Sequence, residues 1–390
     1  MKTIQNKKVF YSGLIYLITV LSYIGFRLLW MFLDLSSTMD PAIADLVFTV
    51  CVQSILFALP FLLYILICKQ NIKQTSSRFF FHKISFKTIL ISLLIGVLTY
   101  VVVVYVSTFW SVLLQLFGYS SSSSESVSAL PVWLTFLIAF FSTALLPAIG
   151  EETSHRGLLL GNLRDNGLRR AVVISALLFG LAHLNIPQFG YAFVVGLILG
   201  AVTLITRSIF PAMIIHGTSN FCSTYISYSI ANDWVGSGAI NTFLNLLSNS
   251  SIIGIFISIL LFTGAIIGIK LLLPKLFIEA KRDKFIKFKQ NLERSTQGTE
   301  MGQMIDFSNQ HQMVILFNEA NAKDMQRKFE EGKLNINHME KEFQSDPTVA
   351  MMYSEIDDYS PPNKMDNLFT FIAIFLTTFI TIATFIWGIL

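Results

Sequence analysis

Charged side chains are scarce in this chain. Only 13% of its 390 residues are Asp, Glu, Lys or Arg, whereas 53% are hydrophobic. Soluble proteins carry roughly 25% charged residues, so the composition excludes a soluble globular protein. It predicts an integral membrane protein whose fold is all-α, a polytopic transmembrane helical bundle.

Cysteines are also few, and two common protease signatures are missing. Cys51, Cys68 and Cys222 lie in or beside apolar segments, as small buried hydrophobic residues do, and predict neither a disulfide framework nor a zinc knuckle. The zinc-protease pattern HExxH and the aspartyl-protease pattern GxGD are absent. No repeat period indicates a solenoid.

Long apolar runs fill much of the chain. A bilayer core of about 30 Å is crossed by about 20 apolar residues in a helix. Nine segments are predicted to cross the membrane: 10–33, 42–68, 88–117, 131–163, 171–184, 189–205, 210–230, 252–273 and 368–390. The first segment is too long for a signal-peptide core, so we expect it to be retained.

Lysine and arginine are concentrated in alternate connections between these segments. Because such residues stay in the cytoplasm more often than not, we expect a cytoplasmic N-terminus and an external C-terminus. The connections 34–41, 120–124 and 232–249 are poor in basic residues and are predicted to face outward. The basic residues of the predicted cytoplasmic side are Lys2, Lys7, Lys8, Lys69, Lys73, Arg78, Lys83, Lys87, Arg164, Arg169, Arg170, Arg207, Lys275, Lys281, Arg282 and Lys284.

Two polar regions accompany the apolar segments. The stretch 78–83 mixes aromatic residues with cations, as anchors at a membrane surface do. The region 275–366 begins with a basic, helix-spaced apolar stripe that we expect to lie on membrane lipid, and it ends in an acidic stretch. Its composition predicts short helices and linker, either as a tether for the last segment or as a binding site for a protein partner. Nothing indicates nucleic-acid binding.

The expected organisation therefore has five parts. Three N-terminal helices occupy 1–130, and the helices that carry the polar motifs occupy 131–230. An outer loop and an eighth helix follow in 231–274, then a cytoplasmic polar extension in 275–366 and a last transmembrane helix in 367–390.

Ionisable residues inside the predicted segments are few. Each such group costs roughly 2.5 to 3.5 kcal/mol at the bilayer centre, so a cluster of them indicates a functional site. Residues four apart share a helix face, which places Glu152 beside Arg156 and His216 beside Asn220. Arg27, alone in the first segment, is interpreted as a snorkelling or paired arginine. The polar residues singled out here are Arg27, Glu151, Glu152, His155, Arg156, His183, His216 and Asn220.

Groups on different helices can act together only at the same depth in the bilayer. At about 1.5 Å per residue, Glu151 and His183 each lie about 18 Å from the cytoplasmic face, and His216 lies about 13 to 14 Å from it. This holds only if the fourth helix continues to residue 163. If that helix ended at Glu152, the carboxylates would lie at the membrane surface, away from His183.

Three ordered motifs carry these residues. Glu151-Glu152-Thr153-Ser154-His155-Arg156 matches EExxxR, Phe179 to His183 matches FxxxH, and His216 to Asn220 matches HxxxN. Together they resemble the signature motifs of the CPBP family of intramembrane proteases, which includes Rce-type CAAX prenyl endopeptidases and bacterial Abi proteins. The resemblance covers about 131–230. The polar residues at 153–155 depart from it, because bulky apolar residues are usual there.

The resemblance implies an eight-helix core, to which the ninth helix is an addition, in a bacterial plasma membrane. It also implies hydrolysis of a peptide bond in a membrane-anchored or lipidated, CAAX-like, protein or peptide. Glu151 would activate water as the base, with His183 holding the water. Glu152 would pair with Arg156 and orient Glu151.

The remaining motif residues, His216 and Asn220, would stabilise the oxyanion. Glu151, His183 and His216 also form a ligand set that a divalent metal such as zinc accepts, so metal-dependent and metal-free reactions both stay open. Two other classes of function remain as alternatives. One is a non-proteolytic scaffold or immunity protein that acts through 275–366. The other is a proton-coupled transporter, which the lack of evident inverted repeats disfavours.

Overall fold

The computed structural model describes residues 6–120, 127–248, 252–280, 282–308, 316, 320 and 363–389. Within these residues all regular structure is helical, which confirms the predicted all-α bundle. Seven of the described helical segments are long and apolar enough to cross a membrane. They are α1 (Lys7–Phe32), α2 (Pro41–Cys68), α4 (Phe86–Leu116), the run Val132–Asn166, α9 (Ile186–Thr206), α12 (Ile252–Ala280) and α18 (Leu368–Trp387).

Two further segments that the sequence predicted as membrane spans are helices inside the bundle. These are α8 (Leu168–Ala182) and α10 (Phe210–Ala231). The first is only 15 residues long. The second is rich in serine, threonine and asparagine, and these polar side chains lower its apolar character. The helix α8 therefore falls short of the other seven in length, and α10 falls short in hydropathy.

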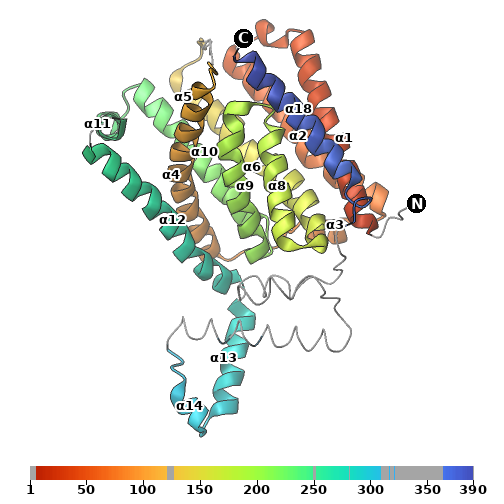
Figure 1. Cartoon of the computed structure of the whole chain (residues 1–390), viewed down its shortest axis with the longest axis vertical. Coiled ribbons are helices and arrows are strands. Elements are labelled where there is room, and N and C mark those ends of the chain that lie inside the picture. Colours follow the sequence, from red (N-terminus) through yellow and green to blue (C-terminus); the bar gives the residue numbers. More distant parts are fainter. Residues whose placement is uncertain are drawn as a thin grey trace.

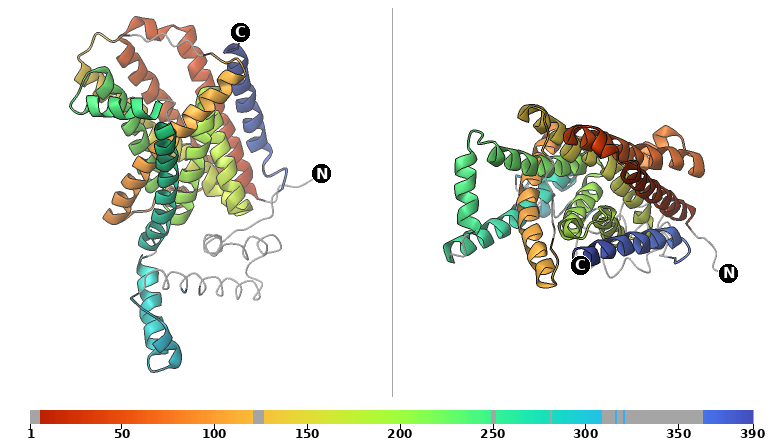
Figure 2. Two further views of the ribbon diagram at one scale, coloured as in Figure 1. Left: turned by 60° about the vertical axis from the view of Figure 1, so that its left-hand side comes forward. Right: turned by 90° about the horizontal axis from the view of Figure 1, so that it is seen from above.

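The helices α8 and α9 form the middle of the bundle (Figure 1 and Figure 2). They pack against each other, and α18 packs on α8 and on α1, which in turn packs on α2. On the opposite side, α4 contacts α9, α10 and α12. The last helix is therefore part of the bundle, beside the first helix of the chain.

Two expectations for the chain that follows α10 need correction. The segment α11 (Ser237–Ser248) lies where an outer loop was expected and is a helix. The eighth predicted segment, α12, continues to Ala280, beyond the expected end at residue 273. Helices α13 (Arg282–Thr296) and α14 (Glu300–Met304) follow and project away from the bundle in Figure 1. The acidic stretch at 340–358 lies outside the described residues.

The run Val132–Asn166 is one continuous helical path with changes of winding. It comprises α5 (Val132–Ala139), the π-helical η2 (Phe140–Leu145), α6 (Leu146–Glu152), the π-helical η3 (Thr153–Leu160), α7 (Gly161–Leu163) and the 3-10 turn η4 (Arg164–Asn166). The helix thus continues past the glutamate pair, as the depth argument requires. A π turn shifts backbone pairing from i−4 to i−5, as between the Leu146 N–H and Phe141 O.

Small residues allow two close helix contacts beside the motifs. A Cβ atom at Gly150 would lie 2.8 Å from the backbone oxygen of Gln53, so α2 approaches α6 closely there. A Cβ at Gly196 would lie 2.8 Å from Cα of Ala176, where α8 meets α9. Both glycines are adjacent to residues of the candidate site, and larger side chains would push the helices that carry it apart.

One end of the bundle, where α3 (Ile72–Arg78) lies, is densely packed. The stretch Leu158 to Leu160 is fully buried against Phe79 and Phe80. The Phe80 carbonyl accepts a hydrogen bond from Ile209 N at 2.9 Å, and Arg164 stacks over the Phe80 ring at 4.5 Å. The aromatic and basic stretch at 78–83 therefore packs into this end of the bundle and closes it. We call it the closed end.

Candidate active site

Four of the six predicted catalytic residues line one cavity of about 480 Å³. Glu151 comes from α6, His183 from the end of α8, and His216 and Asn220 from α10. We call this space the α10 cavity. The other two predicted residues, Glu152 and Arg156, lie behind it and are fully buried. The structure therefore brings all six predicted residues into one region.

The buried carboxylate of Glu152 has two partners on one oxygen. Arg156 Nη1 donates to Glu152 Oε1 at 3.1 Å, which is the ion pair that the spacing predicted. His216 Nδ1 lies 3.0 Å from the same oxygen. This second contact was not predicted, because the two residues are 64 positions apart and no local sequence pattern joins them.

The aromatic ring of Phe179 lies at the centre of these groups. The Arg156 guanidinium stacks over it at 4.3 Å from the ring centroid, a favourable cation–π distance. The rings of His183 and His216 meet it edge-on at 5.3 and 5.6 Å. Phe179 is the first residue of the FxxxH motif, so the sequence did contain a signal for this packing position. Only the histidine of that motif was predicted to be catalytic.

His183 is held at the point where the chain reverses between α8 and α9. Its Nδ1–H donates to Phe179 O at 2.9 Å, which leaves Nε2 as the ring nitrogen available to the cavity. The next residue, Leu184, has φ of +51°, in the left-handed region that non-glycine residues rarely adopt. That unusual conformation ends α8 directly after the histidine.

Asn220 joins α10 to η2. Its Nδ2 donates to the Thr143 carbonyl at 2.8 Å. In an α-helix this carbonyl would pair with the N–H of residue 147, but residue 147 is proline and has none. Asn220 donates to it from α10 with one amide N–H, and the amide has a second N–H that a bound molecule could use.

Glu151 lies between the α10 cavity and a second cavity of about 360 Å³, the α1 cavity. Its Oε1 accepts a hydrogen bond from Gln53 Nε2 at 3.2 Å. The α1 cavity is also lined by Tyr16, Arg27 and His155, so it too is partly polar. No sequence signal pointed to Gln53, because its role depends on how α2 packs against α6.

His155, a departure from the family pattern, is fully paired. Its Nδ1–H donates to Glu151 O at 2.8 Å, and its Nε2 lies 2.9 Å from the Tyr16 hydroxyl. The imidazole thus binds the backbone carbonyl four residues earlier, beside the start of the π-helical η3. Tyr16 and His155 therefore fix the backbone at Glu151 from the side of α1.

The histidines have the bonding typical of metal ligands, in that Nδ1 of each is held by a second group. In the part of the chain that the structure describes, however, no three His, Cys, Asp or Glu side chains are grouped closely enough to hold a metal ion. The predicted ligands Glu151, His183 and His216 share a cavity without forming such a cluster. We therefore derive no step through a metal.

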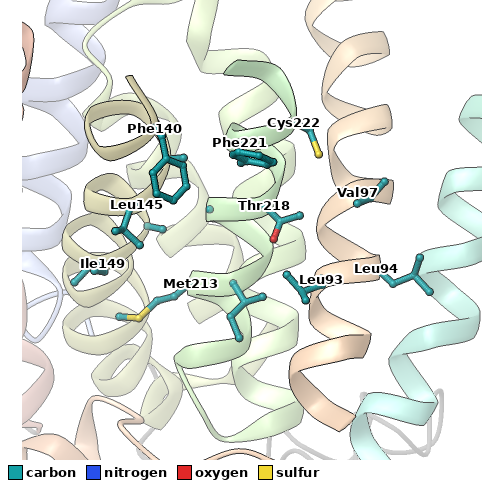
Figure 3. Close-up of a pocket in the computed structure, with 14 residues that line it drawn as sticks. Leu93, Leu94, Val97, Phe140, Leu145, Ile149, Met213, Thr218, Phe221 and Cys222 are labelled. Carbon is teal, nitrogen blue, oxygen red and sulfur yellow. The ribbon is translucent and has the colours of Figure 1, made fainter. Parts of the chain in front are cut away.

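A third cavity is apolar and carries none of the predicted catalytic residues. It measures about 890 Å³ and lies between α4, the run Val132–Asn166 and α10 (Figure 3). Figure 3 shows Leu93 and Val97 of α4 facing Phe140 and Leu145 across it. Gly217, next to His216, also lines it, so this apolar groove adjoins the candidate site through α10.

Comparison with known families gives one match. Residues 133–222 match the family model described as Rce1-like, type II CAAX prenyl endopeptidase Rce1-like. Neither the curated proteins nor the solved structures gave a match. The matched segment includes all three motifs and confirms the resemblance, because it is consistent with a CPBP family intramembrane protease. It supports a CAAX-type intramembrane endopeptidase in general, and thus an integral membrane protein with a membrane-associated or lipidated substrate.

Proposed function

We propose that this protein hydrolyses a peptide bond in a membrane-anchored protein or peptide, with Glu151 as the general base. The observation that carries the proposal is the convergence of Glu151, His183, His216 and Asn220 on one cavity. These residues come from three separate helical elements. They supply a base, a side chain that holds the attacking water, and hydrogen-bond donors for the oxyanion, which are the groups that amide hydrolysis requires.

The reaction begins with water held between Glu151 and His183. Glu151 takes a proton from the water as its oxygen attacks the carbonyl carbon of the substrate. The C–N bond of the tetrahedral intermediate then breaks, and the proton passes from Glu151 to the leaving nitrogen. The products are one carboxylate end and one amine end, with one water consumed.

The oxyanion faces His216 and Asn220. With Nδ1 of His216 committed to Glu152, Nε2 is the nitrogen directed to the substrate, and in the imidazolium form it donates to the oxyanion. The second amide N–H of Asn220 is the other donor. Glu152 and Arg156 are positioning residues in this scheme, because they hold the His216 ring and do not touch the substrate.

The apolar groove beside α10 suits the anchor of such a substrate. It is almost purely apolar and adjoins His216 through Gly217. A lipid chain or a transmembrane anchor lying in this groove would bring the attached peptide close to the reacting groups. The position of the apolar groove beside His216 supports a membrane-anchored substrate over a freely soluble peptide.

The decisive test is Glu151→Gln in the purified full-length protein. The amide keeps the size and the Gln53 contact but cannot accept the proton, so cleavage should fall by about 10²- to 10⁴-fold. The matched control is Glu293→Gln, the same chemical change at an exposed position of α13, which should cleave normally. Assays with and without a chelator measure metal dependence in the same experiment.

Retention of cleavage by Glu151→Gln would contradict the proposal. A cellular phenotype that survives this substitution, but is lost when residues 281–366 are deleted after the end of α12, would instead support the scaffold function. The deletion joins α12 to α18 through a flexible linker, so that both bundle helices are retained.

A further inference from the structure

Both polar cavities extend from Glu151 toward the same end of the bundle. On the run Val132–Asn166, the α10 cavity is lined by Glu151, Pro147, Thr143 and Ala139, at steps of four residues along one helix face. On α10 its lining continues from His216 to Tyr228. Both directions lead away from the closed end, toward residues 117–120, 127–131 and 232–236.

The α1 cavity follows the same direction on the other side of Glu151. Along α1 its lining proceeds from Tyr16 to Arg27, toward the end of that helix. Along α2 it includes Gln53 and Thr49, toward the start of that helix. The two cavities share Glu151 and His183, so the reacting groups lie where the two meet.

A further cavity of about 520 Å³ joins this route to the loop between α1 and α2. It shares Arg27 and Phe48 with the α1 cavity, and it is also lined by Ser36 and Ser37 of the loop and by Pro41 at the start of α2. Arg27 is half-buried at the junction, and its Nη1 donates to the Tyr23 hydroxyl at 3.3 Å. The predicted lone arginine is therefore part of the wall of a polar route.

Toward the closed end, by contrast, the site is sealed. Arg156 and the leucines at 158–160 have no exposed surface, and Phe79 and Phe80 pack beneath them. Arg78 forms an ion pair with Asp165 at the same end. Water and substrate therefore reach Glu151 from the opposite end, which we call the open end.

The sequence distinguishes the two ends by charge. The connections 33–41, 117–131 and 231–251 at the open end contain no Lys or Arg, whereas the closed end carries the basic residues of 69–87, 164–170 and 207. Basic connections stay in the cytoplasm. The closed end therefore faces the cytoplasm and the open end faces outward.

We propose that the site is entered from the extracytoplasmic side, so that its substrate is a membrane-anchored or exported peptide whose scissile bond lies at the outer leaflet. The reaction assumed here rests on the proposed function. The side of access rests only on the cavities and on the charge of the connections. It disfavours a lipidated C-terminus that stays in the cytoplasm, because both polar cavities that contain Glu151 lead away from the closed end.

Access is tested by cysteine labelling, independently of cleavage. In a background where Cys51, Cys68 and Cys222 are replaced by alanine, Thr49→Cys probes the α1 cavity and Ser227→Cys the α10 cavity. Both should react with a membrane-impermeant charged thiol reagent in intact cells. The control, Ser77→Cys in exposed α3 at the closed end, should react only after permeabilisation. The reverse pattern, or no labelling of either cavity variant, would overturn the inference.

The substrate side is tested with two reporter libraries. Each carries a randomised segment next to a single-span anchor, outside the cell in one library and in the cytoplasm in the other, with Glu151→Gln as the background. Cleavage confined to the external library supports the proposal, and cleavage of the cytoplasmic library overturns it. Labelling from outside with no cleavage in either library contradicts the proposed function while leaving the side of access established.

Discussion

At the scale of single residues, the burial of Glu152 and Arg156 governs the site. Neither side chain has exposed surface, so each would be costly alone, and their ion pair at 3.1 Å compensates the two charges. Arg156 adds a hydrogen bond from Nη2 to Gly196 O at 3.2 Å, which ties η3 to α9. A planar, forked cation is needed to reach all three of its neighbours: the carboxylate, the carbonyl and the Phe179 ring.

Arg156→Met should destabilise the protein by about 3 to 5 kcal/mol, because it removes the guanidinium that pairs with the buried Glu152 carboxylate. Thermal or denaturant unfolding in detergent micelles measures the change. Combining Arg156→Met with Glu152→Gln should recover part of this loss, since the buried charge is then removed. Equal destabilisation in the single and double variants would show that packing of Arg156, not charge, is what matters.

At the scale of elements, the π-helical segments and Pro147 create backbone groups that side chains of the site satisfy. Pro147 has no N–H to offer Thr143 O, and Asn220 donates to that carbonyl from α10. The π-helical η3 begins beside Glu151, and His155 donates to Glu151 O. Irregular winding of this helix is thus the means by which α10 and α1 are attached to it at the level of Glu151.

Asn220→Leu should cost about 0.5 to 1.5 kcal/mol of stability, the net value of a typical hydrogen bond, and should also remove cleavage. Adding Pro147→Ala supplies a backbone N–H that can pair with Thr143 O. We expect the double variant to regain stability in unfolding measurements but not cleavage, because the oxyanion donor is still missing. If cleavage returned with stability, Asn220 would be only a structural link.

At the scale of the whole molecule, the open end is held together by Asp40 at the start of α2. Its Oδ1 accepts from Ser128 Oγ at 2.8 Å and from Ala42 N at 2.9 Å, and its Oδ2 accepts from Ala129 N at 2.9 Å. Partial desolvation acts to raise the pKa of Asp40. The hydrogen bonds outweigh it and hold the pKa below the usual range.

Asp40→Asn should therefore give a small loss of thermal stability at neutral pH. A carboxyl whose pKa is lower in the folded state stabilises the fold above the unfolded pKa of about 3.9, and this contribution disappears as pH falls through the folded pKa. Melting temperatures of the two proteins should converge over that acidic range. A difference that stayed constant down to acidic pH would contradict a role for the charge.

Much of the candidate site could be predicted from the sequence because its signals are local. The pair of Glu152 and Arg156 follows from a four-residue spacing, and the common cavity of Glu151, His183 and His216 agrees with similar depths along their helices. The contact of His216 with Glu152 and the support of Glu151 by Gln53 join distant parts of the chain. Such contacts depend on helix rotation and packing, which hydropathy does not encode.

The sequence by itself determined that the chain is an apolar helical bundle with basic residues in alternate connections and an ordered set of polar residues in its middle. Composition and periodicity suffice for this, because burial in lipid acts on each segment separately. Only the tertiary structure decided where the open and closed ends lie. Access to Glu151 depends on the side chains that α1, α2 and α10 bring together around it, and that is a property of how the helices pack.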